Sequence, residues 1–162
     1  MRMPFTVSTA NRQLLEKSLP VQDENTEYQL CVETPSVDDY LRLRIISGLS
    51  PKGREAAEIG LPNTIHAAII RYQGQAVGMG RIVGDKGCFY QVVDIAVDPE
   101  HQGKGLGKII VENLVDYVQN NAPDGAYCSL IADGPAKYLY EKFGFEPVTP
   151  KSIGMALRVK RT

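Results

Sequence analysis

The stretch VVDIAVDPEHQGKGLGKIIVENLVDYV, residues 92–118, decides the fold of this chain. It begins with the apolar run Val92–Val97, which predicts a buried strand. A glycine-rich turn follows, and apolar residues then recur every three to four positions, the period of a helix with one buried side. The first N–H groups of such a helix have no partner within it, and its dipole attracts anions. The succession of strand, glycine turn and helix therefore predicts an anion-binding loop.

Two common phosphate-binding motifs do not fit this loop. The P-loop needs a second glycine where this chain, counted from Gly103, has Lys108, and the dinucleotide fingerprint fails at the same residue. The order that fits is Gln/Arg-x-x-Gly-x-Gly/Ala, here Gln102, Gly105 and Gly107. An ordinary strand-to-helix turn that binds nothing is the alternative interpretation.

A second motif lies nearer the C-terminus, in the run DGPAKYLYEKFGF that starts at Asp133. It matches the pattern Asn-x-x-Ala-x-x-x-Tyr-x-x-x-Gly-Phe at Ala136, Tyr140, Gly144 and Phe145. Together with the glycine loop and the strand end Ala-Val-Asp-Pro before it, this run resembles the GNAT superfamily of acyl-CoA N-acyltransferases. Asp133 stands where the family has asparagine, and an ionised aspartate cannot donate a hydrogen bond.

The resemblance extends over about residues 28–159 and implies an α/β fold, with a GNAT-like mixed, mostly antiparallel central sheet of six to seven strands flanked by about four helices. Residues 28–162 are expected to form this domain, with residues 1–27 as an N-terminal extension. Strand runs and cap residues predict the individual elements. The expected strands are residues 28–34, 64–72, 75–83, 88–97 and 126–132, followed by the last strands, which start at Phe145 and close with Ile153–Val159. The expected helices start after the caps Ser36 and Ser50, near Leu106 and at Ala136.

The resemblance also implies where acetyl-CoA would bind as co-substrate, without a metal. The pyrophosphate is expected on backbone N–H groups of the glycine loop, where lysines would add positive charge. The pantetheine arm is expected on free backbone groups of the fourth strand, where the family's sheet opens at a bulge. The implied residues are Ile95, Ala96 and Val97 on the strand, Gln102, Gly103, Lys104, Gly105, Leu106, Gly107 and Lys108 in the loop, and Asp133, Ala136 and Tyr140 in the second motif.

Tyr140 and Asp94 are the expected catalytic residues. Tyr140 matches the family's general acid, which protonates the thiolate that leaves CoA. Many members have a basic carboxylate where this chain has Gln91, which cannot accept a proton. Asp94 lies in the same strand, and its role stays open between a general base and a hydrogen-bonded carboxylate that fixes the bulge. Glu55, or an amine that arrives deprotonated, are further alternatives.

Composition argues against several classes of protein. With 18 Lys+Arg against 19 Asp+Glu, the net charge is −1, which gives no basic field for nucleic acid or a membrane surface. No apolar run reaches the roughly 20 residues of a transmembrane helix, and the first residues lack a signal-peptide core, so cytoplasmic localisation is expected. The three cysteines form no CxxC pair, and no cluster of ligand residues indicates a metal.

These inferences predict an acetyl-CoA-dependent N-acetyltransferase, an acyltransferase that works by direct transfer in a ternary complex. A small primary amine is the expected acceptor, because the chain shows no separate peptide-docking module. Three alternatives stay open: an acyl-CoA-binding regulatory module without turnover, a protein lysine or N-terminal acetyltransferase, and a phosphate- or nucleotide-binding regulator. The resemblance also favours a homodimer.

Overall fold

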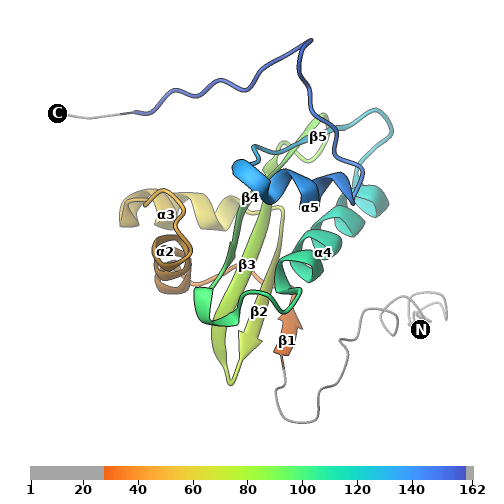
Figure 1. Ribbon diagram of the computed structural model, residues 1–162. Helices are drawn as coiled ribbons and strands as arrows, with labels where there is room; N and C mark the ends of the chain where they lie inside the picture. Colours follow the sequence, from red (N-terminus) through yellow and green to blue (C-terminus); the bar gives the residue numbers. More distant parts are fainter. Residues whose placement is uncertain (1–27, 160–162) are drawn as a thin grey trace, which may run out of the picture.

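The computed structural model describes residues 28–159, and the expected N-terminal extension lies outside them. These residues form one sheet of five strands in the order β1-β2-β3-β4-β5 (Figure 1). The strands are β1 (Tyr28–Cys31), β2 (His66–Tyr72), β3 (Gln75–Gly84), β4 (Phe89–Val97) and β5 (Tyr127–Ser129). Neighbours from β1 to β4 are antiparallel, and β5 is parallel to β4. The mixed, mostly antiparallel sheet is confirmed, whereas the expected six to seven strands exceed the five observed.

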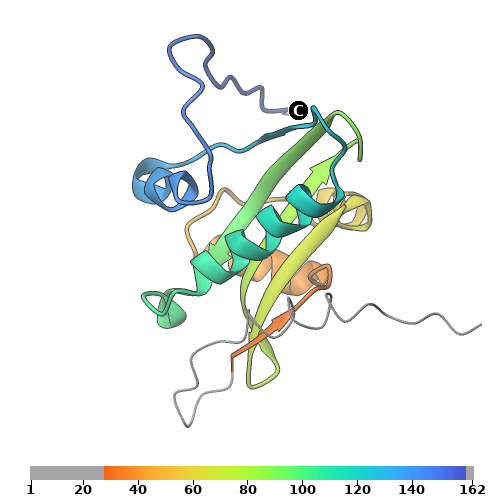
Figure 2. The same cartoon turned by 90° about the vertical axis from the view of Figure 1, so that its right-hand side faces the viewer.

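Four α-helices flank the sheet within residues 28–159, as expected, together with three short 3₁₀ helices. The α-helices are α2 (Val37–Ile46), α3 (Arg54–Gly60), α4 (Leu106–Asn121) and α5 (Lys137–Glu141), and the 3₁₀ helices are η1 (Leu61–Asn63), η2 (Pro99–His101) and η3 (Gly134–Ala136). α4 covers one face of the sheet, and α2 and α3 cover the other (Figure 1, Figure 2). No helix in this described part is long and apolar enough to span a membrane.

Two apolar layers hold the helices on the sheet. On one face Ile110 and Leu114 of α4 pack with Ile70 of β2, and on the other face Leu43 of α2 packs with Ile69. Neighbouring residues of a strand point to opposite faces, so Ile69 and Ile70 serve one layer each. All five side chains are at most 2% exposed. Burial of both faces is the reason why the central strands are nearly continuous apolar runs.

Local capping signals predicted one helix start and missed another. Ser36 caps α2 as expected, because its hydroxyl accepts the backbone N–H of Asp39 at 3.1 Å. The helix start expected at Ser50 is wrong, since α3 begins only at Arg54. The backbone carbonyl of Ser50 instead accepts Nε of the buried Arg44 at 2.7 Å, which holds this turn outside the helix.

The last part of the chain departs most from the sequence-based prediction. β5 spans only Tyr127–Ser129, and neither the strand expected from Phe145 nor the expected closing strand, Ile153–Val159, forms. After α5 the chain runs away from the domain (Figure 1, Figure 2). A strand needs a partner edge for its backbone N–H and C=O groups. Within residues 28–159 no other strand pairs with this segment, which is the physical reason for the difference.

Gly80 of β3 lies so close to α4 that a methyl group has no room there. An added Cβ would lie 2.5 Å from Cγ2 of Ile110 and 2.6 Å from Cδ1 of Ile95. We expect Gly80→Ala to lower the free energy of unfolding by about 1–3 kcal/mol through overpacking, measured by urea denaturation. Gly60→Ala in α3 is the matched control, because nothing lies within 4 Å of its Cβ position and alanine favours helices. Equal losses in both variants would contradict the packing described.

Candidate active site

β4 and β5 pair only over the first part of β4. Their ladder joins Phe89 to Tyr127, Tyr90 to Cys128 and Gln91 to Ser129. β4 continues to Val97, but no strand in the described part of the chain pairs with it on that side beyond Gln91. The two parallel strands therefore separate, and β5 does not use the backbone of Val92–Val97. This is the arrangement that the family resemblance implied for the fourth strand.

A β-bulge lies in the part of β4 that β5 has left. The ladder with β3 pairs Arg81 with Val93 and Met79 with Ala96, so the register shifts between these pairs. Asp94 lies within the shift and has φ of 61°, a left-handed conformation that aspartate tolerates better than most residues. Bulges re-aim side chains, often beside functional sites. Here the Asp94 side chain is directed toward α2, where it meets polar partners.

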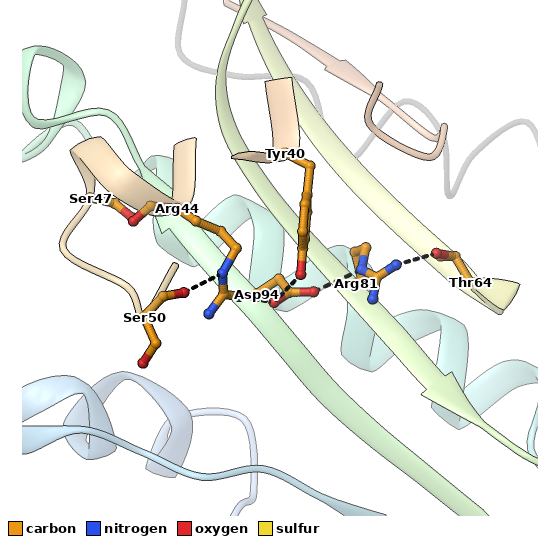
Figure 3. A network of polar contacts seen from close by, with 7 residues as sticks. All are labelled: Tyr40, Arg44, Ser47, Ser50, Thr64, Arg81 and Asp94. Atoms are coloured by element: carbon orange, nitrogen blue, oxygen red, sulfur yellow. Dashed lines mark hydrogen bonds and ion pairs between the residues drawn. The ribbon is translucent and has the colours of Figure 1, made fainter. Parts of the chain in front are cut away.

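The Asp94 carboxylate is the centre of a buried polar network (Figure 3). Its Oδ1 accepts Nη1 of Arg44 and, at 3.4 Å, the hydroxyl of Tyr40, both from α2. Its Oδ2 accepts Nε of Arg81 from β3 at 2.8 Å, and Nη1 of Arg81 donates to Oγ1 of Thr64 at 2.8 Å. The three charged side chains are 7–8% exposed. Each carboxylate oxygen of Asp94 is thus occupied by a guanidinium group.

Tyr40 completes this network between the two arginines. Its ring centroid lies 5.6 Å from Cζ of Arg44 and 5.4 Å from Cζ of Arg81, within the range of cation–π attraction. Burial, and after it the charge of Asp94, raises the pKa of Tyr40 above its ordinary value of 10.0. The phenol therefore stays neutral at physiological pH and adds no negative charge to the network.

The glycine loop connects the end of β4 to α4. Gly103 and Gly105 have φ of 76° and 78°, a left-handed conformation that glycine adopts without strain. Gly105 is the N-cap of α4 and brings no capping side chain, so the loop leaves the first N–H groups of the helix uncapped. The side-chain amide of Gln102 donates to the carbonyl of Val97 at 3.0 Å. The residues from Gln102 to Lys108 thus form a backbone cradle directly beyond the separated strand.

A contact that no motif predicts attaches this loop to β1. The hydroxyl of Tyr28 lies 2.9 Å from Nδ1 of His101 and accepts Nζ of Lys104 at 2.9 Å. The hydrogen bond with Tyr28 raises the pKa of Lys104, so its ammonium charge is retained beside the loop. Tyr28 is separated from these two residues by 73 and 76 positions, and no local pattern could have indicated the contact.

The second motif lies against the same loop. A Cβ added to Gly107 would be 3.8 Å from Cδ2 of Leu139, so α5 contacts the start of α4. Tyr140 is 8% exposed, and burial, followed by the charge of Asp133, raises its pKa above the ordinary 10.0. Ala136 is half-buried at the end of η3, and Asp133 is exposed and does not cap η3 with its side chain. The structure therefore brings the helix of the second motif, with Tyr140, to the glycine loop.

Metal and thiol chemistry find little support in the described part of the chain. Within it, no group of His, Cys, Asp and Glu residues could hold a metal ion. All three cysteines are unpaired, with Cys88 exposed and Cys31 and Cys128 half-buried. Burial raises the pKa of Cys128, which disfavours the reactive thiolate.

Comparison with known proteins decides the family. Residues 63–147, slightly more than half of the chain, match the family model of the acetyltransferase (GNAT) domain. The chain belongs to the GNAT family. The recognition of this family from two short motifs is therefore confirmed.

Three relatives place this GNAT domain among known proteins. A solved structure of a protein of unknown function from meticillin-resistant Staphylococcus aureus, described as a probable acetyltransferase, is 44% identical with a TM-score of 0.79, over 82% of this chain and 100% of that one. The chloroplastic GCN5-related N-acetyltransferase 2 of Arabidopsis thaliana is 40% identical over 70 residues, which are 43% of this chain and 26% of that protein. The histone acetyltransferase TAP1 of Glycine max is 34% identical over 74 residues, 46% of this chain and 31% of that protein. The matched region is thus a third or less of these two curated relatives.

The contact of Tyr28 with the glycine loop is open to a direct test. We expect Tyr28→Phe to speed amide hydrogen exchange in residues 102–107, because Lys104 and His101 both lose their hydrogen bond to the Tyr28 hydroxyl. Exchange in the core of α4 should be unchanged. Tyr127→Phe, an exposed tyrosine on β5, is the matched control. Loop exchange equal to that of the parent protein would show that the Tyr28 hydroxyl does not order the loop.

Proposed function

We propose that this GNAT domain is an N-acetyltransferase that moves the acetyl group of acetyl-CoA to a primary amine, by direct transfer in a ternary complex. The observation that carries the proposal is the separation of β4 from β5 directly before the uncapped start of α4. Free backbone groups on a strand suit an amide-containing arm, and a helix N-terminus suits a pyrophosphate. The two together suit a ligand that combines both groups.

Acetyl-CoA would lie along this line as co-substrate. Its pyrophosphate would accept hydrogen bonds from backbone N–H groups between Gln102 and Lys108, where Gly103 and Gly105 place no side chain in the way. Its pantetheine arm would run beside Ile95 and Ala96. The carbonyl of Val97 already accepts the amide of Gln102, so the arm would meet Val97 through its remaining backbone atoms.

The chemistry needs one bond formed, one broken and two protons moved. The amine nitrogen attacks the thioester carbonyl, a C–N bond forms, and the C–S bond breaks to release the CoA thiolate. We assign Tyr140 as the general acid that protonates this thiolate, and the tyrosinate is then reprotonated from solvent. The raised pKa keeps the Tyr140 proton in place before transfer, as an acid requires.

Asp94 is better suited to fixing the bulge than to acting as general base. Of the two roles that the sequence left open, the base would need a free carboxylate oxygen near the amine. Both oxygens accept guanidinium donors, from Arg44 and Arg81. We therefore propose that Asp94 positions β4. The amine arrives neutral or first gives its ammonium proton to water, and its nitrogen gives a further proton to water once the C–N bond has formed.

The acceptor, the partners, the assembly and the localisation are also proposals. We favour a small primary amine, and protein lysine or N-terminal acetylation is the alternative that the name of the Glycine max relative supports. An acyl-CoA-binding module without turnover is the third candidate. We propose that the protein assembles as a homodimer. We also propose that neither nucleic acid nor a membrane is its partner. Three free cysteines suit a reducing compartment, and we propose the cytoplasm.

The function is tested by release of free thiol from acetyl-CoA against a panel of amines, amino acids, polyamines and peptides. Release that depends on one acceptor class would support the transferase. Tyr140→Phe should lower turnover by about 10²–10⁴-fold and leave CoA binding nearly unchanged. Tyr138→Phe, an exposed tyrosine on the same helix, should have no effect. Equal turnover in both variants would remove Tyr140 from the acid role.

Binding is tested separately from turnover. Gly105→Glu should abolish the rise in melting temperature that CoA causes, because it puts a carboxylate where the pyrophosphate would lie. Gly125→Glu is matched in backbone strain, since both glycines have φ of 78°, but it lies in the turn before β5. No thermal shift by CoA in the parent protein would overturn the proposed function. A shift without thiol release from any acceptor would favour the binding module.

A further inference from the structure

The network around Asp94 holds one more positive charge than negative charge. Arg44 and Arg81 are both buried, and within residues 28–159 Asp94 is the one acid that pairs with either of them. Tyr40 is neutral and cannot balance the second cation. Burying an uncompensated charge is costly, and buried cations in proteins are therefore usually paired with anions. An anion from outside the chain would supply the missing partner.

A cavity beside this network is shaped and charged for such an anion. It has a volume of about 240 Å³ and lies between α2, α3 and β3. Lys52 adds a second cation to its lining, and no acidic residue lines it in the described part of the chain. Its wall includes Tyr40, Lys52, Ala57, Gly60, Leu61 and Arg81. Because pockets for whole ligands are typically about 300–1,000 Å³, this cavity suits one end of a molecule.

The position of the cavity connects it to the proposed reaction. Arg81 lines the cavity and also donates to Asp94, the residue directly before Ile95 on the separated strand. A group bound at Arg81 is therefore one side chain away from the strand on which the thioester would lie. We propose that this cavity binds the anionic group, a carboxylate or a phosphate, of the amine acceptor. This inference rests on the proposed transferase function and names its acceptor class.

Paired acceptors that differ in one anionic group test this proposal. The pairs are ethanolamine with phosphoethanolamine and butylamine with 4-aminobutanoate, compared by thiol release. We expect kcat/KM at least tenfold higher for one or both anionic members, because they alone pair with Arg81 and Lys52. Lys52→Ala should lower that preference several-fold, and Lys52→Glu should lower it further. Lys86→Ala, an exposed lysine in the turn between β3 and β4, is the control and should leave the preference unchanged.

Binding of inorganic phosphate and acetate, followed by NMR shifts of the Gly60 and Leu61 amides, separates this proposal from the transferase itself. Lys52-dependent shifts without any thiol release would support the anion site and overturn the proposed function. Thiol release without an anionic preference, or with a preference that Lys52→Glu leaves intact, would overturn the anion site. The phosphate and carboxylate pairs distinguish the two sources of the anion.

Discussion

The ion cluster at Asp94 is the constraint on which the rest of this structure depends. One carboxylate, placed by a bulge in β4, holds Arg44 of α2 and Arg81 of β3. Removing it would leave two buried cations facing each other, and breaking a buried pair typically costs about 3–5 kcal/mol. The helical layer of α2 and α3 is therefore coupled to the conformation of β4. Arg81 thus joins the wall of the cavity to the separated strand through Asp94.

The same bulge is supported from the opposite face of the sheet. The register shift that places Asp94 lies opposite Gly80, and Gly80 leaves space for Ile110 and Leu114 of α4. α4 in turn begins at the glycine loop. The charged network on one face and the apolar packing on the other thus define one position of β4. The path proposed for acetyl-CoA runs from the unpaired part of β4 to the start of α4. Contacts on both faces of the sheet define this path, and not the glycine loop alone.

Short sequence patterns predicted the features that depend on residues close together in the chain. The Ser36 cap, the period of α4 and the glycines of the loop each depend on residues a few positions apart, and all three were predicted correctly. Long-range contacts explain most of what was missed. The start of α3 was misplaced because Arg44 takes the Ser50 carbonyl, a choice that follows from the position of Arg44 in the buried network.

The same difference between local patterns and long-range contacts applies to the candidate site. The residues from Gln102 to Lys108 and Tyr140 could be named because glycine spacing and a short motif mark them. The partners of Asp94 lie 50 and 13 positions away, and Tyr28 lies 76 positions from Lys104, so only the folded chain brings them together. For Ile153–Val159 the alternating apolar pattern predicted a strand that the structure does not form. Such a pattern indicates which face of a strand would be apolar, but it does not supply the neighbouring edge that a strand needs.

One deficit remains in a domain that is otherwise well satisfied. Within residues 28–159 no buried side-chain nitrogen or oxygen lacks a hydrogen-bond partner. Against that background the excess buried cation in the Asp94 network stands out, because folded proteins are stable by only about 5–15 kcal/mol and gain little from an unmatched charge. Arg81 of this network lines a cavity that a ligand can enter. A ligand that binds only the folded state adds its binding free energy to stability, so the anion would stabilise the fold that it completes.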